Sequence, residues 1–283
     1  MPLHVPVVII CIDTRVAVAN RPGSDNDGFE RQYVDGFAVY VGEWNRPPVH
    51  PYAYREWNGQ NSAFFSWQGL QSDSNVVISE LSRPRGSTAL TRMTHTAFHV
   101  FQPNLGITGR HAPMAGTPAL TLSYMLEMNA LIEAISSEGE AKFEAARDAL
   151  SIRHARREAF RTSDRENNVL SAEGTATYME LRLHFSRDEI VVMIQTWPDE
   201  FFVRAEKCIL GRHGSIAGAY DYLGGALWGI VLDELGVIWR PYFTQDSDFG
   251  MFLQEALGIE PIPLDEINLE RFGYSVIAEW ANS

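Results

Sequence analysis

The chain has 283 residues, 45% of them hydrophobic, which is enough for a sizeable core in one large domain or two tightly joined lobes. It carries 23 Lys and Arg against 36 Asp and Glu, a net charge of −13 at pH 7. A phosphate backbone is bound through basic side chains, so this balance argues against nucleic-acid and anionic-membrane partners. Neutral or cationic small substrates remain as candidates.

No segment of the chain has the character of a membrane span. The longest apolar run, residues 5–12, is interrupted by Pro6, is too short to cross a bilayer and lacks the basic region of a signal peptide. We therefore expect a soluble, cytoplasmic protein. Its two cysteines, Cys11 and Cys208, lie in apolar contexts and are interpreted as buried free thiols, with a disulfide left open by their spacing.

The first 80 residues predict a small β-rich lobe. The near-continuous apolar run at its start is typical of a buried strand, and residues 20–28 have the composition of a turn. The many aromatic residues of segment 44–67 either pack beneath long loops, the preferred interpretation, or line a substrate-binding wall. Strands are expected at 5–12, 16–19, 37–41, 63–67 and 76–78.

The remainder, residues 81–283, predicts a mainly helical domain, because apolar residues recur there at helical spacing. Ser87 or Thr88 can cap its first helix, which Pro103 ends. The expected fold class is α+β, with lobes 1–80 and 81–283 joined in one compact unit. Further helices are expected at 119–136, 138–160, 165–185, 211–236, 249–257 and 265–280, and segment 189–194 is either helical or extended.

The first helix carries two histidines on one face. His95 and His99 are four residues apart, about one helical turn, so a single metal ion can bind an imidazole from each. An apolar stripe and a polar stripe run along this helix. The apolar one consists of Leu90, Met93, Ala97 and Phe101, and the polar one of Arg92, His95, His99 and Gln102.

The segment Thr94-His-Thr-Ala-Phe-His-Val-Phe-Gln102 resembles the HExxH zinc helix of zincin metallopeptidases. The segment Ala172-Glu-Gly-Thr-Ala-Thr-Tyr-Met-Glu180 is similar to the EGxAxY helix of the gluzincins, whose glutamate completes a His/His/Glu site. The resemblance thus implies a Zn²⁺ site at His95, His99 and Glu173. Further matches extend it over residues 85–243, and the first 80 residues match more loosely. These matches are LE-x-x-AL at 126–131, FR-x-x-R at 152–156, Y-x-x-G-A-x-x-G at 222–229, LD at 232–233 and WR at 239–240.

One departure from the family falls at the catalytic position. The glutamate of HExxH is a general base, and this chain has Thr96 in its place. A threonine hydroxyl lies two carbons short of where the glutamate oxygens would be, and its pKa is far from neutral. Losing a general base typically costs about 10²–10⁴-fold in rate. Ordinary peptidase activity by the family's route is therefore expected to be crippled.

Three interpretations of Thr96 remain. In the first, which we prefer, zinc acts as a Lewis acid on a small molecule or modified peptide, while Glu127, Glu180 or a histidine moves protons. In the second, the protein is a pseudo-peptidase that binds a peptide or metabolite without turnover. In the third, Thr96 is an engineered replacement of a native glutamate, which ranks last because mutants made to trap substrates usually carry Ala or Gln. An intact ligand set with an altered base indicates redirected chemistry more than decay.

Other polar residues have two possible roles each. Glu127 either accepts a hydrogen bond from a ligand imidazole or pairs with one of the arginines. Tyr222 either donates to an oxyanion or belongs to the core. His111 and His213 lie in glycine-bounded loops, at the surface or near a cleft. The glycine-rich run 211–229 lacks a phosphate-binding pattern and predicts close helix packing instead.

Overall fold

The computed structural model describes residues 7–11, 15–20, 29–34, 37–43, 52–57, 60–66, 89–108, 116–205 and 212–282. The chain divides into two compact units. The first contains a β-sheet and the helix that follows it, and the second contains the helices from Leu105 onward. The expected α+β class, with a β-rich start and a mainly helical remainder, is confirmed.

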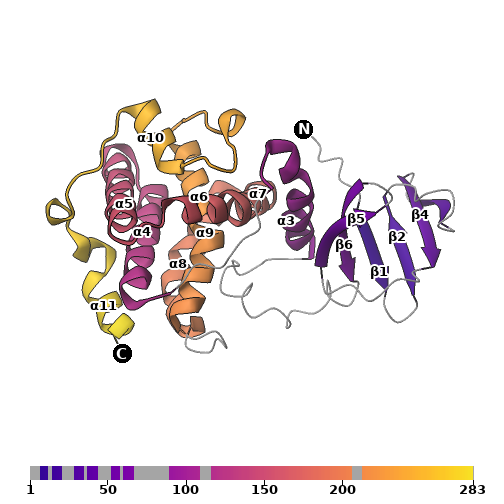
Figure 1. Ribbon diagram of the computed structural model, residues 1–283, viewed down its shortest axis with the longest axis horizontal. Helices are drawn as coiled ribbons and strands as arrows, with labels where there is room; N and C mark the ends of the chain where they lie inside the picture. The colour runs from indigo at the N-terminus through magenta and orange to yellow at the C-terminus, as the bar shows by residue number, and fades with distance from the viewer. Residues whose placement is uncertain are drawn as a thin grey trace. The chain divides into compact units, whose positions relative to one another are not determined.

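The sheet of the first unit has six strands (Figure 1) in the order β3-β4-β2-β1-β6-β5. Strand β1 pairs in parallel with β6, and the other neighbouring strands are antiparallel. The strands are β1 (Val7–Cys11), β2 (Val16–Ala19), β3 (Glu30–Val34), β4 (Phe37–Glu43), β5 (Tyr52–Trp57) and β6 (Gln60–Ser66).

The apolar character of β1 follows from burial on both of its faces. Val8 and Ile10 pack in one cluster with Phe64, whereas Val7 and Ile9 pack on the opposite side of the strand. Successive side chains of a strand point to opposite faces, so covering both faces requires the near-continuous apolar run seen in the sequence.

Four of the five expected strands are confirmed, and two others were not foreseen. Strands β3 and β5 escaped prediction because charged residues interrupt their apolar pattern, as in Glu-Arg-Gln-Tyr-Val and Tyr-Ala-Tyr-Arg-Glu-Trp. The strand expected at 76–78 lies outside the described residues, as do the caps expected at Ser87 and Thr88. Cys208 and the side chain of Cys11 are also outside them, so the prediction of free thiols stays a prediction.

Helix α3 (Ala89–Phe101) packs on β5 and β6. Met93, Ala97 and Phe101 of its predicted apolar stripe contact the sheet cluster, which places the two histidines on the opposite face of the helix. Because this stripe is buried on the sheet, α3 belongs to the first unit, whereas the predicted boundary at residue 80 assigned it to the helical domain. As expected, the α-helix ends before Pro103, which lies in the short 3₁₀ helix η1 (Gln102–Leu105).

In the second unit α4 packs against α5 and α9 (Figure 1). The helices are α4 (Pro118–Ser136), α5 (Gly139–Phe160), α6 (Ser163–Val169), α7 (Thr175–His184), α8 (Arg187–Ala205), α9 (Arg212–Glu234), α10 (Phe249–Leu257) and α11 (Tyr274–Asn282). The shorter segments are the π turn η2 (Leu170–Gly174) and the 3₁₀ helices η3 (Arg240–Tyr242), η4 (Leu264–Glu266) and η5 (Leu269–Phe272).

Most predicted helices are confirmed, and two of them are interrupted. The helix expected at 165–185 contains the π turn η2, and the one expected at 265–280 consists of two 3₁₀ turns and α11. The second break falls at Gly273, whose φ of 81° is a left-handed conformation that ends a helix. The ambiguous segment 189–194 is helical, as part of α8.

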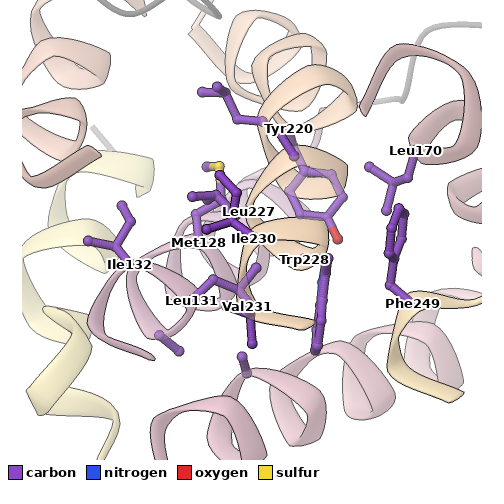
Figure 2. Close-up of a cluster of buried hydrophobic side chains, with 14 of the residues drawn as sticks. Met128, Leu131, Ile132, Leu170, Tyr220, Leu227, Trp228, Ile230, Val231 and Phe249 are labelled. Atoms are coloured by element: carbon purple, nitrogen blue, oxygen red, sulfur yellow. The ribbon is translucent and has the colours of Figure 1, made fainter. Parts of the chain in front are cut away.

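The core of the second unit lies where α4 meets α9 (Figure 2). Met128 and Leu131 of α4 are buried beside Leu227 and Trp228 of α9. Among the described residues, no helix is both long and apolar enough to cross a bilayer.

Candidate metal centre

The two histidines of α3 face each other at a distance suited to sharing a metal ion. Their Nε2 atoms are 3.1 Å apart, and the rings meet edge to face. Two zinc–nitrogen bonds of about 2.0–2.1 Å at a tetrahedral angle place their nitrogens about 3.3 Å apart. The pair therefore has nearly the separation that one zinc ion requires.

Gln102 determines which nitrogen of His99 carries the proton. The His99 Nδ1–H donates to the Gln102 side-chain oxygen over 2.9 Å, and an amide oxygen can only accept. In the neutral imidazole the proton is then on Nδ1, and the lone pair of Nε2 points toward His95. This is how metal-binding histidines are usually oriented, with the second ring nitrogen held by a fixed acceptor. His95 is buried and His99 half-buried.

Glu173 lies in the π turn η2, between α6 and α7. The backbone N–H of Thr175 donates to the carbonyl of Leu170, five residues earlier, which is the π-helical pattern. Such single wide turns within α-helices occur frequently at functional sites. Glu173 is half-buried.

A backbone contact holds the other side of the π turn. A Cβ placed on Gly174 would lie 2.5 Å from the Cα of Gly225, and one on Gly225 would lie 2.7 Å from the carbonyl oxygen of Leu170. No other residue type fits at either position without moving backbone. The prediction that the glycine-rich run serves close helix packing is therefore confirmed at Gly225.

His95, His99 and Glu173 form a group that could hold a metal ion, each side chain offering one ligand atom. Two imidazoles and a carboxylate are a donor set typical of catalytic zinc sites, which keep a fourth position for water or substrate. The residues present thus fit the metal that the resemblance implies. Thr96, next to His95, is only 4% exposed and brings no carboxylate to this position.

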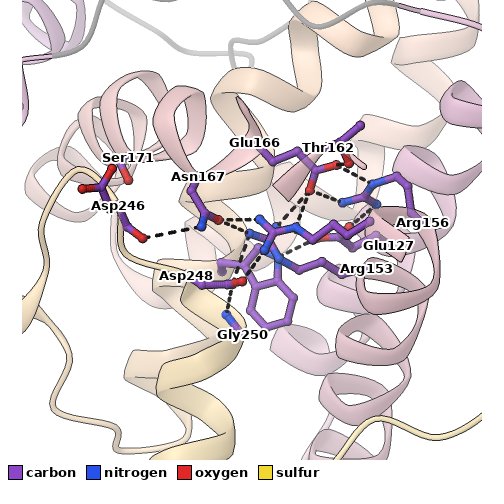
Figure 3. Close-up of polar contacts among 12 residues, drawn as sticks. Glu127, Arg153, Arg156, Thr162, Glu166, Asn167, Ser171, Asp246, Asp248 and Gly250 are labelled. Carbon is purple, nitrogen blue, oxygen red and sulfur yellow. Dashed lines mark hydrogen bonds and ion pairs between the residues drawn. The ribbon is translucent and has the colours of Figure 1, made fainter. Parts of the chain in front are cut away.

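Glu127 has the second of its two predicted roles, as a partner of arginines (Figure 3). It is fully buried, and Arg153 and Arg156 both donate to it. Its Oε1 also accepts from the Tyr220 hydroxyl at 2.8 Å and the Trp228 indole at 2.6 Å. Both Glu127 oxygens thus accept hydrogen bonds from donors of the second unit, and its predicted role beside a ligand imidazole stays a prediction.

The network around Glu127 joins five helices with balanced charge. Arg156 and Arg157 both donate to Glu166 of α6, while Asp248, the N-cap of α10, pairs with Arg153 and Arg157. Burial alone would raise the pKa of Glu166, but the Arg156, Arg153 and Arg157 guanidinium groups outweigh it and hold that pKa far below its usual range. Buried charges are tolerated here because each has a partner.

A second polar network anchors α7 on the far side of the π turn. The Tyr178 hydroxyl donates to Asp233 at 2.6 Å and accepts from Arg240 at 2.7 Å, and the Trp239 indole donates to the same Asp233. Burial, then the carboxylate of Asp233, raises the pKa of Tyr178 above its usual value, so the phenol keeps its proton. The tyrosine of the EGxAxY match and the LD and WR matches therefore meet in one place.

The other predicted candidates are placed as follows. Tyr222 is half-buried on α9 and Glu180 is buried on α7, and the functional roles of both stay predictions. His111 and the side chain of His213 lie outside the described residues.

Sequence reasoning did not single out Glu166, Tyr220 and Asp248, which complete the Glu127 network. A signal for them was present in α5. Arg153, Arg156 and Arg157 have the i, i+3, i+4 spacing of one helix face, a cluster of charge that requires acidic partners from elsewhere in the fold.

No family model, curated protein or solved structure matches this chain.

Proposed function

We propose that His95, His99 and Glu173 bind a zinc ion and that the chain is a zinc-dependent enzyme acting on a small molecule or modified peptide. One observation carries the proposal: the His95 and His99 Nε2 atoms lie 3.1 Å apart, with the His99 tautomer set by Gln102. The likeness to the gluzincin HExxH and EGxAxY segments supports it. When bound, zinc would supply Lewis-acid chemistry, polarising an electronegative atom of the substrate.

The proton transfer must come from a residue other than Thr96. Glu127 is committed to its arginines, which leaves Glu180 among the carboxylates considered from the sequence. We propose that Glu180 or a histidine transfers the proton.

A second candidate function is binding without turnover. The buried Thr96 favours it, since no carboxylate stands where the gluzincin base would be. A substrate screen distinguishes the two functions. Zinc-dependent hydrolysis or elimination that is lost in His99→Ala and weakened in Glu180→Gln supports the enzymatic function. Ligand binding with no turnover supports the pseudo-peptidase.

Restoring the missing base tests whether the site has the gluzincin arrangement. With zinc bound, Thr96→Glu is expected to gain at least about 10²-fold in hydrolysis of a general fluorogenic peptide substrate over the wild type. Thr96→Gln is the matched control, because it has the same length without a carboxylate. A zinc-loaded Thr96→Glu chain no more active than Thr96→Gln would contradict the arrangement.

A further inference from the structure

We infer that Gly225 and Ser171 are positioning residues for Glu173: they hold the π turn that directs its carboxylate. This inference rests on the proposed metal site. Neither residue touches the metal in this proposal, and both act through the backbone of η2 (Leu170–Gly174).

The turn matters because it sets the direction of Glu173. A π turn contains one residue more than an α-turn, and each residue of a helix rotates the chain by about 100°. Inserting or removing the extra residue would therefore turn Glu173 away from its present direction relative to α7. Both flanking helices are fixed, α6 through Glu166 and α7 through Tyr178, so neither can rotate to compensate.

Three contacts hold the turn in its π form. Gly225 of α9 lies against Gly174 and the Leu170 carbonyl, where an added Cβ would be 2.7 Å from backbone atoms of both. On another side the Ser171 hydroxyl donates to the carbonyl of Gln245 at 2.9 Å. Within the turn, the Thr175 hydroxyl donates to the Ser171 carbonyl.

These contacts keep a backbone form that helices seldom adopt. An unusual conformation persists only where its surroundings over-determine it, and such places cluster at functional sites. The half-buried Glu173 is the residue of this turn with metal-binding chemistry. The contacts therefore preorganise a ligand as well as stabilise the helix pair.

Cobalt(II) binding to the full chain tests the inference, because its visible absorption reports the ligand geometry directly. Gly225→Ala is expected to weaken cobalt affinity by about 10-fold or more and to change the spectrum, a loss typical of disturbed supporting groups. The matched control is Gly250→Ala, in α10. Its Cβ would meet the Leu150 side chain at 2.7 Å, so it adds an overlap at a similar distance away from the π turn.

Ser171→Ala serves if Gly225→Ala does not fold, with Ser151→Ala as its control. Ser151 is also a buried hydroxyl bonded to a backbone carbonyl, in α5. The inference predicts weaker cobalt binding and an altered spectrum in Ser171→Ala, with wild-type binding in Ser151→Ala. Wild-type affinity and spectrum in both Gly225→Ala and Ser171→Ala would overturn it. A wild-type chain that binds no cobalt would instead overturn the metal site itself.

Discussion

The hydrogen bond from His99 to Gln102 shows how one neutral residue can orient a histidine in the way that metal binding requires. By accepting from Nδ1, Gln102 fixes the ring orientation and leaves Nε2 available, 3.1 Å from its counterpart on His95. The sequence placed Gln102 on the polar stripe of the helix and in the segment that resembles the zincin helix. The tautomer of His99, however, depends on the distance between the His99 and Gln102 side chains, which the sequence does not give.

Replacing Gln102 tests this role. Gln102→Leu is expected to weaken zinc affinity by about 10–100-fold, because the ring loses the acceptor that orients it. Gln102→Glu should retain affinity, since a carboxylate accepts the same hydrogen bond. Zinc dissociation constants from competition with a chelator measure both, and equal affinity in Gln102→Leu and the wild type would refute the role.

Substitution of Glu127 distinguishes a structural role for this residue from a role at the metal site. Glu127→Gln is expected to lower the free energy of unfolding by about 3 kcal/mol or more, since it leaves buried arginines without full compensation. Glu133→Gln, on the same helix, should cost at most about 1 kcal/mol, because its pair with Arg271 is partly exposed.

Urea unfolding followed by circular dichroism measures both changes. Zinc affinity should not differ among Glu127→Gln, Glu133→Gln and the wild type. A Glu127→Gln chain of normal stability that had lost zinc binding would show that Glu127 serves the metal after all.

At the scale of elements, helices α3, α4, α5 and α9 could be read from apolar spacing and from proline or glycine at their ends. The π turn could not, because nothing local distinguishes residues 170–174 from an α-helix. Gly225, which contacts this turn closely, lies 50 or more residues later in the chain. The glycine-rich run 211–229 was predicted to allow close helix packing, but the sequence did not show which segment packs against it.

Asp248 begins α10 and also pairs with arginines, and two substitutions separate these contributions. Its Oδ1 accepts from the Gly250 N–H at 2.8 Å. Asp248→Asn keeps a good cap and loses the charge, whereas Asp248→Ala loses both, so Ala should be less stable than Asn by about 1 kcal/mol. Equal urea midpoints for the two variants would mean that the cap contributes nothing.

For the whole molecule, a β-rich start followed by a mainly helical remainder was predictable from composition along the chain. That α3 belongs to the unit with the sheet was not. An amphipathic helix shows that one face is buried, but not against what, and here the partner is the sheet rather than the later helices. The donor set His95, His99 and Glu173 was suggested by motif spacing, whereas the polar networks around Glu127 and Tyr178 appear only in three dimensions.

Acid stability of the chain should reflect the buried carboxylates. Burial raises and nearby arginines lower the pKa of Glu166 and Asp248, and the net pKa of each is below its usual value. A carboxyl group whose pKa is lower in the folded than in the unfolded chain stabilises the folded state fully at pH values above its unfolded pKa of about 4. That stabilisation is lost as the pH falls from there toward the folded-state pKa.

The free energy of unfolding should therefore decline below about pH 4.5, and less steeply in Glu166→Gln than in the wild type. Urea midpoints between pH 7 and pH 3 provide the comparison. An identical pH dependence in the two chains would contradict the proposed charge coupling.

The zinc content of the purified chain, measured by elemental analysis in wild type, His99→Ala and His154→Ala, decides whether the metal centre exists. His154 is an exposed histidine of α5 and controls for the loss of any imidazole. We expect about one zinc per chain in the wild type and His154→Ala, and almost none in His99→Ala. A wild-type chain without zinc even after incubation with the metal, or equal zinc in all three, would contradict the proposed site.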